Sequence, residues 1–156
     1  MRALKRADVA VIREDEQGRV EERVRRLMRP GALLWTVRRE LQVDAAGSAG
    51  PRPMAFCAIA RPEGFVAMLA DALRPVVKAV FFKDHHRYEM ADIERIVRIA
   101  QETKATGFVV TEKDEVKLSV AMYDRLRSIG PVCAVPLQAA FVEADRVARE
   151  LEARIS

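Results

Sequence analysis

Short apolar runs and helical repeats alternate along almost the whole chain. The apolar runs are rich in β-branched and aromatic residues, and several are bounded by glycine or proline. They predict strands at residues 7–13, 32–38, 54–60, 75–82, 107–111 and 131–137. Apolar residues three and four positions apart predict helices at residues 18–29, 61–73, 90–105, 112–129 and 141–155.

The steady alternation of strand and helix indicates an α/β fold. Parallel strands need crossover helices, so the pattern predicts a mostly parallel sheet with helices on both faces, as in Rossmann-like proteins. The run at 54–60, "MAFCAIA", is continuously apolar, as expected for a strand covered on both sides. The stretch 43–53, "VDAAGSAGPRP", predicts an exposed connection between two parts of the chain.

Composition places the chain among ordinary soluble globular proteins. It has 156 residues, of which 50% are hydrophobic and 32% charged. No apolar run approaches the roughly 20 residues of a membrane span, and the N-terminal apolar run is too short for a signal peptide. We therefore expect a cytoplasmic protein. Cys57 and Cys133 lie inside apolar runs and are predicted to be small buried hydrophobic residues.

The net charge is +4 at pH 7, and many basic residues lie within 19–39. Such a segment could bind phosphate or an anionic membrane surface. The alternative is a solvated helix with interleaved glutamates. Nothing in the sequence indicates a nucleic-acid partner.

Three charged loops follow predicted parallel strands, where ligands of open α/β sheets bind. They are residues 60–64, 83–88 and 111–118. The sequence contains neither the G-x-x-x-x-G-K-[ST] phosphate loop nor the G-x-G-x-x-G dinucleotide motif. It also lacks a serine elbow and a cysteine metal motif.

The second of these loops holds the only two histidines, in the order Asp84-His85-His86. Three interpretations are open: a polar turn beside a helix, a catalytic histidine held by a carboxylate, or a metal site. A shared metal ion is disfavoured, because adjacent side chains on extended backbone point to opposite sides. A phosphoesterase of the Asp-His-His type is excluded, because its chemistry needs further histidine ligands.

Three motifs in one order resemble the C-terminal half of the tetraacyldisaccharide 4'-kinases, the lipid A 4'-kinases of Gram-negative bacteria. The motifs are "FCAIARPEGF" at 56–65, "FFKDHHRYEMADIERI" at 81–96 and "VVTEKDEVKL" at 109–118. In addition, "LKRADVAVI" at 4–12 resembles the family's strand after the catalytic carboxylates of the phosphate-loop domain. The resemblance covers nearly the whole chain.

The resemblance implies a function. Family members use ATP and Mg²⁺ to phosphorylate the 4'-hydroxyl of a lipid disaccharide at the cytosolic face of the inner membrane. It implies Asp84 and His85 as the catalytic pair, with His85 supporting a base aspartate of the kinase domain. Arg61, His86, Glu112, Lys113 and Asp114 are implied as cleft-lining residues, and the Thr-Glu-Lys-Asp motif could equally be structural. No metal ligand is implied within this chain.

The chain also departs from the family pattern. Ala58 stands where the family usually has glycine, and Gly64 stands where it has arginine. The phosphate loop and base aspartate would lie before Met1, so the chain resembles a fragment, a split gene product or a divergent partial homologue.

Two hypotheses of function follow. In the first, residues 1–42 are a remnant of the kinase domain and linker, and 54–156 form a Rossmann-like C-terminal domain of a kinase that is inactive without its other half. In the second, the chain is a non-catalytic Rossmann-like module that binds a phosphorylated ligand or a partner chain.

Overall fold

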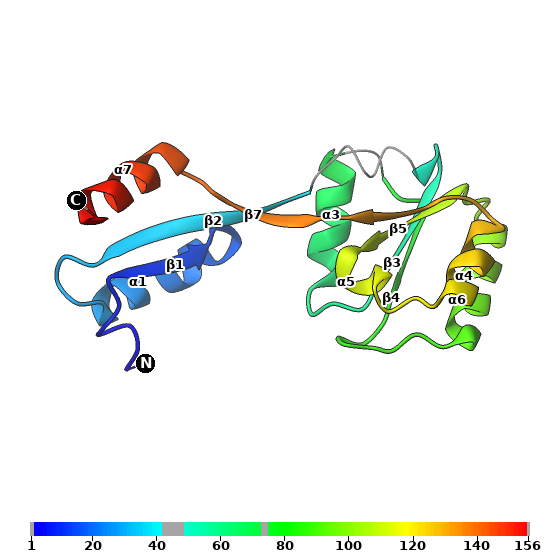
Figure 1. Cartoon of the computed structure of the whole chain (residues 1–156), viewed down its shortest axis with the longest axis horizontal. Helices are drawn as coiled ribbons and strands as arrows, with labels where there is room; N and C mark the ends of the chain where they lie inside the picture. Colours follow the sequence, from blue (N-terminus) through cyan, green and yellow to red (C-terminus); the bar gives the residue numbers. More distant parts are fainter. Residues whose placement is uncertain (1, 42–48, 73–74, 156) are drawn as a thin grey trace. The chain divides into compact units, whose positions relative to one another are not determined.

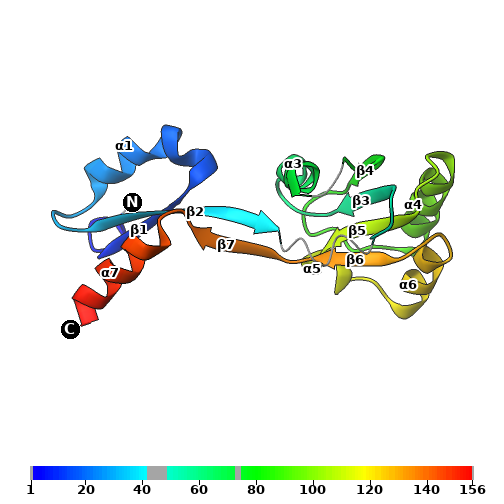
Figure 2. The same ribbon diagram turned by 90° about the horizontal axis from the view of Figure 1, so that it is seen from above.

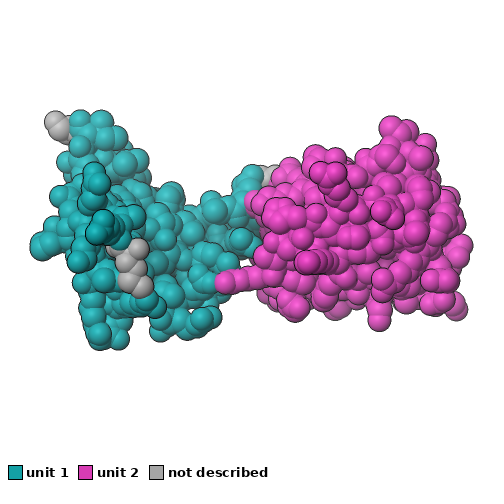
Figure 3. Space-filling model, turned by 90° about the horizontal axis from the view of Figure 1, so that it is seen from below, with its two compact units in different colours: residues 1–40, 138–156 teal, residues 41–137 magenta. Residues whose placement is uncertain are grey.

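The structure is a computed structural model that describes residues 2–41, 49–72 and 75–155. Most of the predicted connection at 43–53 lies outside these residues. The chain forms two compact units: residues 1–40 with 138–156, and residues 41–137 (Figure 3). The predicted second domain, 54–156, therefore differs from the second unit, because the C-terminal segment folds with the N-terminal one.

The second unit is built on a parallel sheet of four strands in the order β4-β3-β5-β6 (Figure 1). These strands are β3 (Pro53–Cys57), β4 (Lys78–Phe81), β5 (Gly107–Thr111) and β6 (Val132–Val135). The helices of this unit are α3 (Pro62–Ala72), α4 (Met90–Glu102), α5 (Glu112–Glu115) and α6 (Val120–Arg127). The predicted α/β class, with a mostly parallel sheet, is confirmed.

Helices cover both faces of this sheet (Figure 2). On one face, Phe65 and Leu69 of α3 pack with Ala55 and Val109 of the strands. On the other face, α4 and α6 pack on the alternate residues of β3 and β5. Neighbouring strand residues point to opposite faces, so every residue of β3 and of β5 is buried.

Gly107 and Gly130 allow a close approach of backbones at the start of β5. A Cβ atom at Gly130 would overlap the carbonyl oxygen of Thr106. Phe108 N–H donates to the carbonyl oxygen of Pro131 at 2.7 Å nearby. This close backbone approach therefore holds β5 and β6 together where the two strands begin.

The first unit has a smaller sheet in the order β1-β2-β7, from β1 (Val9–Arg13), β2 (Leu33–Leu41) and β7 (Leu137–Phe141). β1 and β2 are parallel, and Figure 2 shows β7 running opposite to β2. A 3-10 turn (Glu14–Glu16) leads into α1 (Gln17–Leu27), and α7 (Ala144–Ile155) ends the unit. A small core joins α1 to β1 and β2, and Trp35 of β2 donates to Glu150 of α7 at 2.7 Å.

Two predicted helices differ from the structure by more than a few terminal residues. The helix expected at 112–129 is broken into α5 and α6, because the Ser119 hydroxyl accepts a hydrogen bond from Met122 N–H and starts a new helix. The helix expected at 141–155 begins only at Ala144. β7 precedes it, and pairing with β2 stabilises this strand, which the local sequence pattern does not predict.

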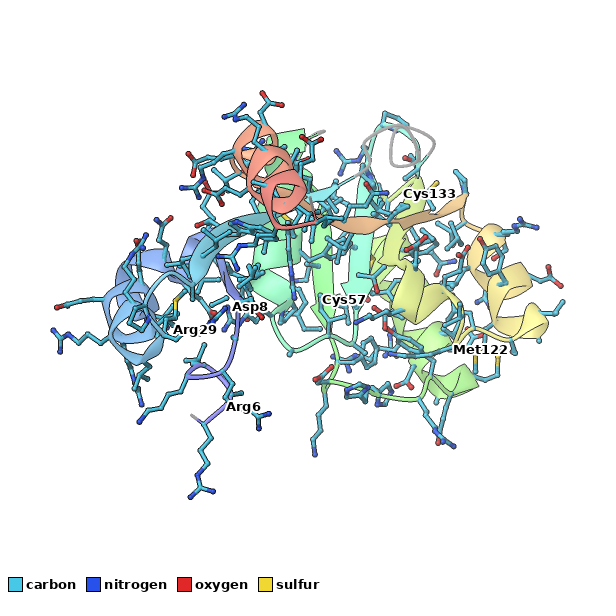
Figure 4. The ribbon with its side chains drawn as sticks, turned by 60° about the vertical axis from the view of Figure 1, so that its left-hand side comes forward. Arg6, Asp8, Arg29, Cys57, Met122 and Cys133 are labelled. Atoms are coloured by element: carbon cyan, nitrogen blue, oxygen red, sulfur yellow. The ribbon has the colours of Figure 1, made fainter. Side chains whose placement is uncertain are left out.

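The arginines of 19–39 are largely paired with carboxylates. Arg25 pairs with Glu21 at 2.8 Å, and Arg26 pairs with Glu22 one position further along α1. Arg29 pairs with Asp8, and both are labelled in Figure 4. These pairs offset much of the local positive charge, as expected for a solvated helix.

Cys57 and Cys133 are buried, as predicted, and lie on β3 and β6, with no disulfide bond to either (Figure 4). Burial, together with the nearby charge of Asp114, raises the pKa of Cys57 to about 12. Its thiol is therefore not a nucleophile near neutral pH. No described helix is both long enough and apolar enough to cross a membrane.

Candidate functional site

The three charged loops lie at one edge of the second unit's sheet. β3, β4 and β5 are parallel, so Cys57, Phe81 and Thr111 end their strands on the same side. β4 and β5 flank β3, and the helices that follow β3 and β5 lie on opposite faces. This is the point in an open α/β sheet where ligands bind.

His85 lies at the tip of the loop after β4 and projects into solvent. Its side chain is 92% exposed, with Nε2 3.7 Å from Asp84 Oδ2. Its backbone is in the left-handed region, with φ of 60°. The turn is held by hydrogen bonds from His86 N–H to Lys83 O at 2.9 Å and from His85 N–H to Ala58 O at 3.3 Å.

His86 turns back toward the protein. Its ring stacks on Phe82 with centroids 4.8 Å apart, and it meets the edge of the Tyr88 ring. Its Nε2 lies 2.8 Å from Asp92 Oδ2. Asp92 also accepts from Glu89 N–H in the capping box that begins α4. Burial raises the pKa of Asp92, but hydrogen bonds from Glu89 and His86 outweigh burial and lower it.

Asp114 is fully buried in α5, directly after β5, and is surrounded by hydrogen-bond donors. Oδ2 accepts from the Thr111 hydroxyl at 2.7 Å and from Ala58 N–H at 3.1 Å. Oδ1 pairs with Lys117 Nζ at 2.9 Å. A buried carboxylate with these partners is strongly oriented, because each partner also satisfies its charge.

Tyr88 lies beside this carboxylate. Burial, then the charge of Asp114, raises the pKa of Tyr88. Its buried hydroxyl makes no hydrogen bond of normal geometry with the described residues, although the Asp114 carboxylate is close. Lys117 Nζ lies 5.9 Å from the centre of the Tyr88 ring.

The structure separates the residues predicted for this site into two groups. Asp84, His85, Arg61, Glu112 and Lys113 are exposed on the three loops. His86 is half-buried and Asp114 is buried, so these two make interior contacts. Sequence reasoning missed Ala58, Tyr88 and Lys117. Only the spacing of Asp114 and Lys117, three residues apart, could have indicated their pairing.

Metal binding finds no support in the part of the chain that the structure describes. No group of three or more His, Cys, Asp or Glu residues is close enough there to hold an ion. The arrangement instead offers an exposed imidazole on a constrained turn, which can accept or donate a proton or orient a carboxylate.

Comparison with known proteins first assigns a class: the chain matches a family of kinases. The family model for tetraacyldisaccharide-1-P 4'-kinase matches residues 1–156, and the chain belongs to this family.

Curated relatives carry the same name. A tetraacyldisaccharide 4'-kinase of Koribacter versatilis is 38% identical over 150 residues, covering 96% of this chain and 43% of that relative. Those of Syntrophus aciditrophicus and Gluconobacter oxydans are each 40% identical, over 78 and 81 residues. These two matches cover 50% and 52% of this chain, and 21% and 24% of the relatives. The chain thus spans less than half the length of the relatives it matches.

Proposed function

We propose that this chain supplies the C-terminal part of a kinase that transfers the γ-phosphate of ATP to the 4'-hydroxyl of tetraacyldisaccharide 1-phosphate. The observation that carries this proposal is the family match over the whole chain. The position of Asp84-His85 at the ligand-binding edge of the sheet supports it.

In this proposal, the chain helps to position the reacting groups. It does not supply the loop that binds the phosphates of ATP. Phosphoryl transfer depends on groups that hold the phosphates and Mg²⁺, and the phosphate-loop motif is absent from these 156 residues. ATP and Mg²⁺ would therefore bind mainly to a kinase half outside this sequence. The lipid substrate would place the complete enzyme at the cytosolic face of the inner membrane.

His85 would act by hydrogen-bonding the carboxylate base that takes the proton of the sugar hydroxyl. Its exposure fits this role, because an exposed ring is accessible to a carboxylate of the proposed kinase half. Asp84 Oδ2, 3.7 Å from the imidazole Nε2, would help to orient the ring. The exposed Arg61, Glu112 and Lys113 are proposed to line the same cleft.

A chimera tests the proposal. This chain replaces the matching 150 residues of the Koribacter versatilis relative, and the product is assayed with ATP, Mg²⁺ and the disaccharide. We expect turnover from the chimera and none from residues 1–156 alone. A folded chimera without turnover, beside an active parent enzyme, would contradict the proposal. Binding of a phosphorylated sugar by the isolated chain would then favour the non-catalytic module.

A further inference from the structure

Asp114 connects the ends of three strands. It belongs to α5, directly after β5, and its Oδ2 accepts from the backbone N–H of Ala58, just after β3. The carbonyl oxygen of the same Ala58 accepts from His85 N–H, in the loop after β4. A continuous path of hydrogen bonds therefore runs from the buried carboxylate to the exposed histidine.

The His85 turn needs such support. A left-handed backbone costs a residue with a Cβ atom about 1–2 kcal/mol, although histidine adopts it more often than most residues. Residues persist in this region only where their surroundings hold them. On one side, His86 is fixed by Phe82 and Asp92. On the other side, the hydrogen bond to Ala58 O holds the backbone of His85.

Asp114 is well suited to fix Ala58. It is fully buried, and its two oxygens are bound by Thr111, at the end of β5, and by Lys117, just after α5. Moving Ala58 N–H away would leave a charged acceptor buried with one partner fewer, which is costly. In this path of hydrogen bonds, the Asp114 carboxylate is thus the rigid end, and His85, with its left-handed backbone, is the strained end.

We propose that Asp114 is a positioning residue that holds the His85 turn in its left-handed conformation through Ala58. Lys117 and Thr111 orient the carboxylate for this task. The importance of His85 rests on the proposed function, but the backbone coupling between Asp114 and residue 85 does not.

The experiment measures amide exchange by NMR on the 156-residue chain. In Asp114→Asn, the protection of the residue 85 amide should fall about tenfold, because a charge-assisted bond to Ala58 is lost. The Phe82 amide, which donates to Cys57 O at 2.9 Å, should keep its protection. Glu94→Gln is the matched control, because it neutralises the carboxylate of an exposed ion pair with Arg125 in the same unit.

A second comparison, made in the His85→Gly variant, distinguishes positioning of the His85 turn from general loosening of the fold. Glycine adopts the left-handed region without steric cost. In His85→Gly, Asp114→Asn should therefore reduce protection at residue 85 by less than about threefold. An equal loss in both backgrounds would overturn the proposal, as would unchanged protection at residue 85 in folded Asp114→Asn.

If Asp114→Asn does not fold, Thr111→Val replaces it. This change removes only the hydroxyl that binds Asp114 Oδ2 and caps α5. It should give a smaller loss of protection confined to residue 85, and unchanged protection there would overturn the proposal. None of these measurements uses the kinase reaction. An inactive chimera and an absence of coupling between Asp114 and residue 85 can therefore be told apart.

Discussion

Two adjacent histidines have different surroundings in this protein. The His85 side chain is 92% exposed, whereas that of His86 is 31% exposed and contacts Phe82, Tyr88 and Asp92. Their side chains diverge because the backbone turns between them, with His85 in the left-handed region. At the residue scale, one histidine is available to a substrate or partner and the other stabilises the start of α4.

The two histidines should therefore give opposite phenotypes in the active chimera. His85→Ala should lower the turnover number by about 10²–10⁴-fold, because it removes a group that positions proton transfer. His86→Ala should cost far less turnover but lower the free energy of unfolding, since its ring is packed. Steady-state kinetics and urea unfolding of both variants check this. Equal, small effects on turnover would mean that the turn is structural.

Asp92 should make stability depend on pH. Its pKa is lowered in the folded state, so it stabilises the fold above its unfolded pKa of about 4, and this contribution disappears as the pH falls through the folded pKa. Asp92→Asn should be less stable than the natural chain at pH 7 by on the order of 1 kcal/mol, and the difference should shrink by pH 3. Urea unfolding at both pH values measures it. Asp71→Asn, at an exposed position of α3, is the control; a difference that does not vary with pH would contradict the assignment.

At the scale of elements, the parallel sheet of the second unit depends on close packing at its beginning as well as on its apolar faces. Gly130 and Gly107 leave space only for hydrogen atoms beside the backbone of residues 106 and 131. Backbone atoms cannot move aside as flexible side chains do, so the start of the β5–β6 pair tolerates little added volume.

Gly130→Ala should consequently destabilise the second unit by about 1–3 kcal/mol or more, because its Cβ would overlap the Thr106 carbonyl oxygen. Gly64→Ala is the matched control. Gly64 lies in α3 with open space around it, and alanine there should stabilise the helix by roughly 0.5–1 kcal/mol. Thermal or urea unfolding distinguishes them, and a neutral Gly130→Ala would show that the strands can separate at little cost.

At the scale of the whole molecule, the two units differ in the size of their cores. The second unit buries apolar residues on both faces of its sheet. The first unit's main cluster contains three buried residues, Ala10, Ile12 and Leu34. β1 lies at an edge of the sheet formed by the described residues, with Val11 52% exposed. An edge of this kind favours association with another strand.

We therefore expect the isolated chain to self-associate through the first unit, and the amides of 1–40 to exchange faster than those of 54–137. Val11→Lys should reduce association, because a lysine on an edge strand opposes pairing. Val120→Lys, at an exposed position on α6, should not. Analytical ultracentrifugation and amide exchange measure both effects. A monomer with uniformly slow exchange would contradict the expectation.

Local sequence determined most of the second unit. The apolar run of β5 and its opening glycine predicted residues 107–111, which are the bounds in the structure. The periodic apolar face of α4 and the buried run of β3 also predicted these elements, although each ends three residues before the predicted end, at Glu102 and Cys57. The three loops at one sheet edge then followed from parallel pairing alone.

Tertiary structure decided what depends on residues far apart in the chain. β7 exists because it pairs with β2, about a hundred residues earlier, and α7 with its partner Trp35 joins the first unit for the same reason. Likewise, nothing in the sequence near Asp114 shows that its carboxylate binds Ala58, or that Ala58 holds His85. The motifs that identify the family are local, whereas the contacts that orient its histidine form only when the ends of β3, β4 and β5 are brought together.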